Sequence, residues 1–153
     1  TFQTHKCWLE TTTRTDSQKT KAMMIAEKVK FQMEIPLNSS KGVLFNCIST
    51  PSGLSEWFCD DVNIKKDVHI FFWDGSEESA RLVSKKTNEF AKFRWLEAEE
   101  EGEDSFFEFR IRVDELTGEN ALVITDFADE DEVEDAKDLW AAQVDRLRQV
   151  LGC

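Results

Sequence analysis

The sequence predicts an α+β fold in which a curved antiparallel sheet of about six to seven strands wraps around one long C-terminal helix. Short segments with apolar residues at every second position, separated by turn residues, indicate the strands. One stretch near the C-terminus has apolar residues at helical spacing, and two short helical segments follow the first strand. The long helix is expected on the inner face of the sheet, because both elements would otherwise leave apolar surface in water.

The first strand and the two short helices are predicted from alternation and capping residues. Residues 28–35 alternate apolar and polar side chains, and Pro36 ends the strand because proline cannot donate to a ladder. The serines before residue 41 can cap a helix over about 40–49. Thr50-Pro51 supplies a cap and a first-turn proline for a second helix, over about 51–58.

The other strands follow as one antiparallel series with turn signals between them. Asp74-Gly75 indicates a hairpin, and residues 97–104 are predicted as an acidic loop. The last strand is apolar on both faces, which predicts a central or covered position. The predicted strands are a weak one around Val62 and Ile64, then 68–73, 78–86, 90–97, 105–113 and 121–127.

Residues 129–152 are predicted to form the long helix. Its apolar residues fall on one stripe at the helical period, which marks the buried face. Acidic residues crowd its first turns, Arg146 and Arg148 lie near its end, and both placements suit the helix dipole. Gly152 is a suitable stop.

Composition excludes several classes of protein. The chain of 153 residues is 41% hydrophobic and carries a formal net charge of −12, which argues for a globular domain and against nucleic acid as a partner. No apolar run is long enough to span a bilayer. The four cysteines (Cys7, Cys47, Cys59 and Cys153) form no CxxC pair or zinc spacing, so we expect reduced thiols in the cytoplasm, with no metal and no cofactor.

Residues 1–24 differ from the rest of the chain. They are rich in threonine, slightly basic, and lack the apolar core of a signal peptide. We interpret them as an N-terminal arm or tail, either passive or a docking arm that uses Phe2, Trp8 and Leu9, and we place the folded domain at 25–153.

The order of elements resembles the START-like, helix-grip superfamily, and within it the Aha-type family of activators of the heat-shock chaperone ATPase. Residues 41–58 resemble that family's pair of short helices, with Thr50-Pro51 and Trp57-Phe58 in the expected places. Residues 84–95 resemble its strand, turn and strand ending in Trp, and residues 140–151 resemble its terminal helix.

This resemblance implies a cavity between the sheet and the long helix that opens near the short helices. Alternation then selects the side chains that would line it and bind a lipid-like or aromatic molecule. Leu54, Trp57 and Phe58 are expected at its mouth. The candidate ligand-binding residues are Phe31, Met33, Leu54, Trp57, Phe58, Phe93, Trp95, Phe107, Phe109, Ile111, Trp140, Val144 and Leu147.

Two other functions stay open at this point. The same rings can fill the core, leaving a chaperone-associated or other protein-interaction domain, monomeric or weakly dimeric, whose acidic clusters at 97–104 and 129–135 steer a basic partner. Some relatives in the superfamily are cyclases or dehydratases. An enzyme of that kind would need an inward acid or base, and here the candidate is His69, which shares a face with Phe71 and Trp73. A structural role for this histidine is the simpler interpretation, so we predict no catalytic residue, and we expect Arg110 and Arg112 on the surface.

Overall fold

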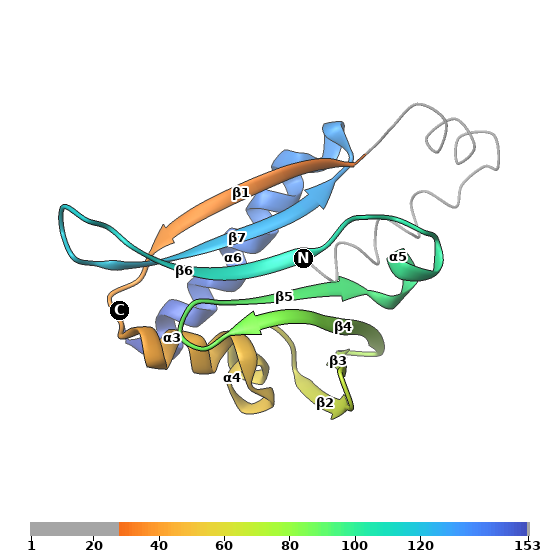
Figure 1. The fold of residues 1–153 in the computed structure, drawn as a ribbon, viewed down its shortest axis with the longest axis horizontal. Coiled ribbons are helices and arrows are strands. Elements are labelled where there is room, and N and C mark those ends of the chain that lie inside the picture. Colours follow the sequence, from red (N-terminus) through yellow and green to blue (C-terminus); the bar gives the residue numbers. More distant parts are fainter. Residues whose placement is uncertain (1–27, 153) are drawn as a thin grey trace.

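One seven-stranded sheet dominates the computed structural model, which describes residues 28–152 of the chain (Figure 1). Every neighbouring pair of strands is antiparallel, in the order β1-β7-β6-β5-β4-β3-β2. The arm predicted at 1–24 lies outside the described residues. The strands are β1 (Val29–Pro36), β2 (Asp61–Lys65), β3 (Val68–Trp73), β4 (Ser76–Lys86), β5 (Phe90–Trp95), β6 (Phe107–Val113) and β7 (Asn120–Ala128).

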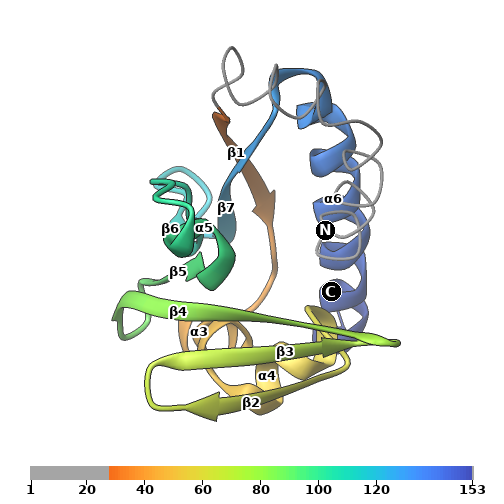
Figure 2. The same cartoon turned by 90° about the vertical axis from the view of Figure 1, so that its right-hand side faces the viewer.

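The long helix α6 and the short helices α3 and α4 lie on the concave side of this sheet (Figure 2). Figure 2 shows the sheet curling from β1 and β7 through β6 and β5 to β4, β3 and β2, with α6 opposite its hollow and α3 and α4 at one end. This arrangement confirms the predicted α+β helix-grip architecture. The helices are α3 (Lys41–Ser49), α4 (Pro51–Trp57), the short α5 (Leu96–Glu100), a 3₁₀ turn η1 (Glu130–Glu132) and α6 (Val133–Leu151).

Local sequence explains where the helices begin and end. The Ser40 hydroxyl accepts a hydrogen bond from the Val43 backbone N–H at 3.2 Å and caps α3. Thr50 caps α4 in the same way, and Pro51 occupies the first turn. Gly152 ends α6 with a left-handed φ of 74°, a conformation that glycine adopts without strain.

The contact between α3 and α4 depends on Gly53. A Cβ at this position would collide with the backbone carbonyl of Asn46. Thr50 joins the same two turns, because its hydroxyl donates to the Asn46 carbonyl oxygen at 2.8 Å and accepts from the Gly53 N–H at 3.0 Å. The two short helices are therefore packed backbone to backbone.

Alternation along the strands sends one set of side chains into the core. On β3, His69, Phe71 and Trp73 are buried, whereas the residues between them are partly exposed. On β7 both faces are buried, because Leu122 and Ile124 belong to the core cluster, while Val123 and Thr125 on the opposite face are also buried. This confirms the covered position predicted for that strand.

Several predicted boundaries are wrong. The long helix, predicted from residue 129, begins at Val133 after the η1 turn, and the strand predicted from residue 105 begins at Phe107. The acidic segment 97–104 is not entirely a loop, because Leu96–Glu100 form α5, which buries Ala98. As a result the strand predicted to reach residue 97 ends at Trp95. β1 includes Pro36, which is tolerated because β1 is an edge strand.

Candidate functional site

An aromatic core lies between the sheet and α6. All of the predicted ligand-binding residues belong to one buried cluster or pack against it. Most are buried, whereas Met33 and Trp95 are only partly buried and pack against the edge of the cluster. The structure therefore brings the predicted set together around one interior.

Phe58, directly after α4, lies at the centre of the cluster. Its ring centroid is 4.8 Å from that of Phe71 on β3, 5.8 Å from that of Phe107 on β6 and 6.1 Å from that of Trp140 on α6. Leu54, Trp57 and Phe58, which the sequence places at a cavity mouth, have no exposed surface. These side chains therefore join the short helices to the sheet from inside.

Three buried indole groups in this core each have a hydrogen-bond acceptor. The Trp57 Nε1–H donates to the Cys47 carbonyl oxygen at 2.8 Å. The Trp73 Nε1–H donates to the Phe58 carbonyl oxygen at 2.9 Å. The third indole, that of Trp140, donates to a carboxylate on β7. Each tryptophan therefore buries its ring without leaving its N–H unpaired.

Asp126 is that carboxylate, and sequence reasoning missed it. It shares the inner face of β7 with Leu122 and Ile124. The Trp140 Nε1–H donates to Asp126 Oδ2 at 2.9 Å, and the Phe127 backbone N–H donates to Oδ1 at 2.8 Å. Burial raises the pKa of the Asp126 carboxyl to about 6, although both hydrogen bonds oppose the shift. The alternation along the strand was the signal that could have found it.

His69 is another polar side chain on the inner face, and it lies on β3, away from β7 in the strand order. Its ring is 3% exposed and packs edge-on against Phe93, with centroids 5.1 Å apart. Neither imidazole nitrogen has a hydrogen-bond partner among the described residues. Burial, with a smaller effect from the charge of Lys85, lowers the pKa of His69 below its ordinary value, so the ring is neutral at pH 7.

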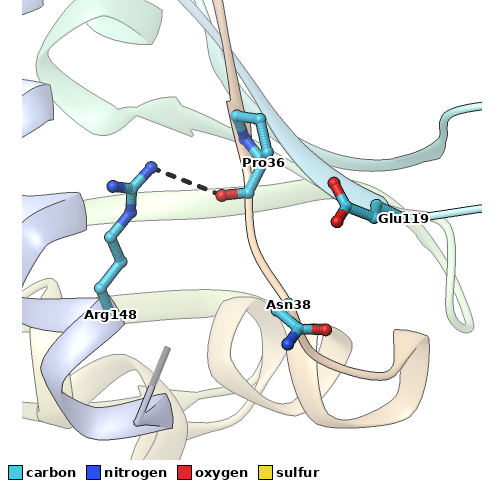
Figure 3. Close-up of a pocket in the computed structure, with 4 residues that line it drawn as sticks. All are labelled: Pro36, Asn38, Glu119 and Arg148. Carbon is cyan, nitrogen blue, oxygen red and sulfur yellow. Dashed lines mark hydrogen bonds between the residues drawn. The ribbon is translucent and has the colours of Figure 1, made fainter. Parts of the chain in front are cut away.

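A separate pocket opens on the surface near the end of α6. Its volume is about 240 Å³, and it is lined by Pro36, Asn38, Glu119 and Arg148 (Figure 3). The Arg148 guanidinium donates to the Pro36 carbonyl oxygen at 3.4 Å. None of the predicted ligand-binding residues lines this pocket.

The surface side chains behave as ordinary charged groups. Arg110 and Arg112 pair with Glu108 and Glu34 on the outer face of the sheet, as expected from alternation. Within residues 28–152, no group of histidine, cysteine or acidic residues could hold a metal ion. None of the helices described there is long and apolar enough to cross a membrane.

The acidic clusters show some mutual repulsion. Burial and the nearby Glu103 raise the pKa of Glu101. Burial and the carboxylates of Asp129, Asp131 and Asp135 raise the pKa of Glu132. A positively charged partner would relieve this repulsion.

Comparison with known proteins places this architecture in a family. The family model of the START-like superfamily domain matches residues 25–153. Among curated proteins, none matches the chain.

Solved structures give the same picture. The solution structure of the Bacteroides fragilis protein BfR322 is 38% identical, with a TM-score of 0.58, over 82% of this chain and 92% of that one. The Aha1 dimer from Colwellia psychrerythraea is 15% identical, with a TM-score of 0.67, over 80% and 96%. The Mesorhizobium loti protein MLL2253 is also 15% identical, with a TM-score of 0.65, over 81% and 97%. At that identity the last two show a shared fold only.

Proposed function

The chain belongs to the START-like superfamily, and from this premise we propose that it is a non-enzymatic domain that binds a hydrophobic small molecule between its sheet and α6. The ligand class is lipid-like or aromatic. The observation that supports this proposal is the convergence of the predicted ligand-binding residues on one aromatic interior. Burial against such an interior is what stabilises an apolar ligand.

Partly buried residues beside the core cluster support a ligand that contacts both the buried rings and side chains at the surface. Trp95 on β5 packs against Phe107, with ring centroids 4.8 Å apart, yet keeps part of its surface exposed. Leu82 on β4 is also partly buried and packs against the same cluster. A ligand that covered these two side chains would remove apolar surface from water without displacing the central rings.

The proposed domain comprises residues 25–153, with residues 1–24 as an arm, and acts in the cytoplasm. Cys47 and Cys59 support a reducing compartment, because both are free, buried thiols. Burial raises the pKa of both thiols, that of Cys59 to about 12, which keeps them protonated and unreactive. These cysteines have no place in the proposed binding reaction.

Native mass spectrometry of freshly expressed protein tests the proposal. We expect a co-purified apolar molecule that is retained under native conditions and released on unfolding. Trp95→Ala should lower its occupancy. Phe90→Ala is the matched control, since Phe90 lies on the outer face of the same strand, beneath Arg110. Protein that carries no ligand and takes up no apolar probe would contradict the proposal.

A second candidate is a chaperone-associated or other protein-interaction domain with a filled core. The close ring contacts around Phe58 favour it, because they leave little room at the centre of the interior. The carboxylates that crowd Glu101 and Glu132 also favour it, since a basic surface would relieve their mutual repulsion.

A binding assay with a purified heat-shock chaperone ATPase separates this candidate from the first. The second candidate predicts salt-sensitive binding that Glu97→Gln, Glu100→Gln and Glu101→Gln together weaken. Glu115→Gln, at the distant β6–β7 turn, is the control and should leave binding unchanged. Binding that neither salt nor these substitutions weaken would contradict an electrostatic interface.

A further inference from the structure

We infer that His69 is the polar anchor of the proposed binding site and forms a hydrogen bond with an uncharged hydroxyl group on an otherwise apolar ligand. The inference rests on the proposed function, because the anchor has a role only if a ligand binds. It assigns a chemical class to the ligand: an aromatic or aliphatic alcohol rather than a hydrocarbon, an acid or an amine.

The position of the imidazole is the first support. His69 is 3% exposed and lies on the inner face of β3. Its ring lies 6.0 Å from that of Phe71 and 5.1 Å from that of Phe93, centroid to centroid. The side chain is therefore held in the aromatic interior, away from water.

The unpaired nitrogens are the second support. Both ring nitrogens of His69 lack a hydrogen-bond partner among residues 28–152. Burying such groups unpaired is costly, and the indoles of Trp57, Trp73 and Trp140 in the same core each have an acceptor. A partner from outside the chain would remove that cost.

The surroundings of His69 select the type of partner. A neutral imidazole has one N–H donor and one acceptor nitrogen, and a hydroxyl group can accept from the first or donate to the second. The two rings that pack on the imidazole are hydrocarbon, so a charged group placed there would be poorly solvated. An uncharged hydroxyl meets both conditions.

The neighbouring strands connect the anchor to the edge of the interior. In the strand register, Ala80 on β4 pairs with His69 on one side and with Trp95 on the other. The row therefore runs from the imidazole across a methyl group to a partly exposed indole. A ligand whose body lay along this row would place its hydroxyl at His69 and its apolar body against Trp95.

Two probes of similar shape test the inference. 2-Naphthol carries a hydroxyl group at the position where 2-methylnaphthalene carries a methyl group. The affinity of each is measured by competition with a fluorescent apolar probe, N-phenyl-1-naphthylamine. We expect the wild-type chain to bind 2-naphthol about fivefold more tightly, the usual size of one net hydrogen bond. His69→Phe should abolish this preference. Phe93→Leu, the control, should weaken the binding of both probes equally and leave the ratio of their affinities unchanged.

Nitrogen-15 NMR of the wild-type imidazole gives a readout that needs no variant. We expect 2-naphthol, but not 2-methylnaphthalene, to change the nitrogen-15 chemical shifts of the His69 ring nitrogens. Equal affinities for the two probes, with unchanged chemical shifts of the ring nitrogens, would overturn the role inferred for His69 and leave the proposed function standing. Failure of both probes and of the fluorescent competitor to bind would overturn the proposed function, and the anchor with it.

Discussion

Asp126 and His69 face the apolar interior from opposite parts of the sheet, and they differ in whether the described residues supply hydrogen bonds to them. Asp126 on β7 accepts hydrogen bonds from Trp140 of α6 and from the next backbone N–H. His69 on β3 has none from the described residues. The difference teaches that burial alone does not identify a functional group: Asp126 has a structural role in holding the helix, whereas the role of His69 is left open by the fold.

The position of α6 explains the difference. Figure 2 shows this helix beside β1 and β7, whereas β3 lies at the far end of the curl, near α4. α6 can therefore supply a donor to Asp126. The rings that approach His69 are those of Phe71 and Phe93, which have no polar atoms to offer.

Removing the donor side chain should produce the largest effect. Trp140→Ala should lower the free energy of unfolding by about 3–5 kcal/mol, because it leaves a hole under α6 and an unpaired carboxylate. Trp140→Phe, which keeps most of the ring, should cost about 1–2 kcal/mol. Urea denaturation measures both. A loss below about 1 kcal/mol for Trp140→Ala would show that the helix does not depend on this side chain.

The second-largest effect should be a pH dependence of stability that comes from the Asp126 carboxyl. Its pKa in the folded chain is about 6, above its ordinary value of 3.8. The folded state therefore holds the proton more tightly, and this stabilisation is present below pH 3.8 and is lost as the pH rises through about 6. We expect a loss of about 1–2 kcal/mol for this partly buried group.

Asp126→Asn is the matched variant for that measurement. It keeps an acceptor for the Trp140 indole but cannot titrate, so it should remove the decline in stability. Thermal denaturation scans between pH 4 and pH 7 would measure the slopes. An identical decline in wild type and variant would assign the titration to another group.

His69 should produce the opposite slope. Its folded pKa lies below the ordinary value of 6.5, so its stabilising contribution is present above pH 6.5 and is lost as the pH falls through the folded pKa. His69→Phe should remove this slope and raise the free energy of unfolding by about 1 kcal/mol at pH 7, because an unpaired polar group is replaced by an apolar ring. Destabilisation by that substitution would indicate that the imidazole has a structural partner after all.

The smallest effect is expected near the start of α6. Glu132→Gln should raise the free energy of unfolding by about 0.3 kcal/mol at pH 7, since it removes a charge that is partly buried and is repelled by neighbouring carboxylates. High salt should reduce the gain by screening the repulsion. Chemical denaturation at low and high salt measures this, and a gain that high salt leaves unchanged would point to packing rather than charge.

Much of the fold follows from local patterns in the sequence. Alternation placed His69, Phe71 and Trp73 on one face, and Ser40 and Thr50 cap the helices that they were expected to cap. These predictions succeed because strand period, capping and helix stop signals depend on residues only a few positions apart.

The features that sequence reasoning missed depend on distant contacts. Trp140 and Asp126 are 14 positions apart and meet only because α6 folds back along β7. α5 is too short to show a helical stripe, although Leu96, Ala98 and its glutamates favour helix. Whether the nitrogens of His69 find partners depends on every element around them, which no local pattern reports.

The close approach at Gly53 joins the two short helices into one packed unit. This unit is also tethered at both ends: the Leu37 N–H donates to Asn120 and the Asp60 N–H donates to Phe72, at 3.0 and 2.8 Å. The proposed ligand could enter past α3 and α4 only by breaking these two backbone hydrogen bonds. If the proposed ligand binds, we therefore expect it to enter at the opposite edge of the interior, where the indole of Trp95 is partly exposed.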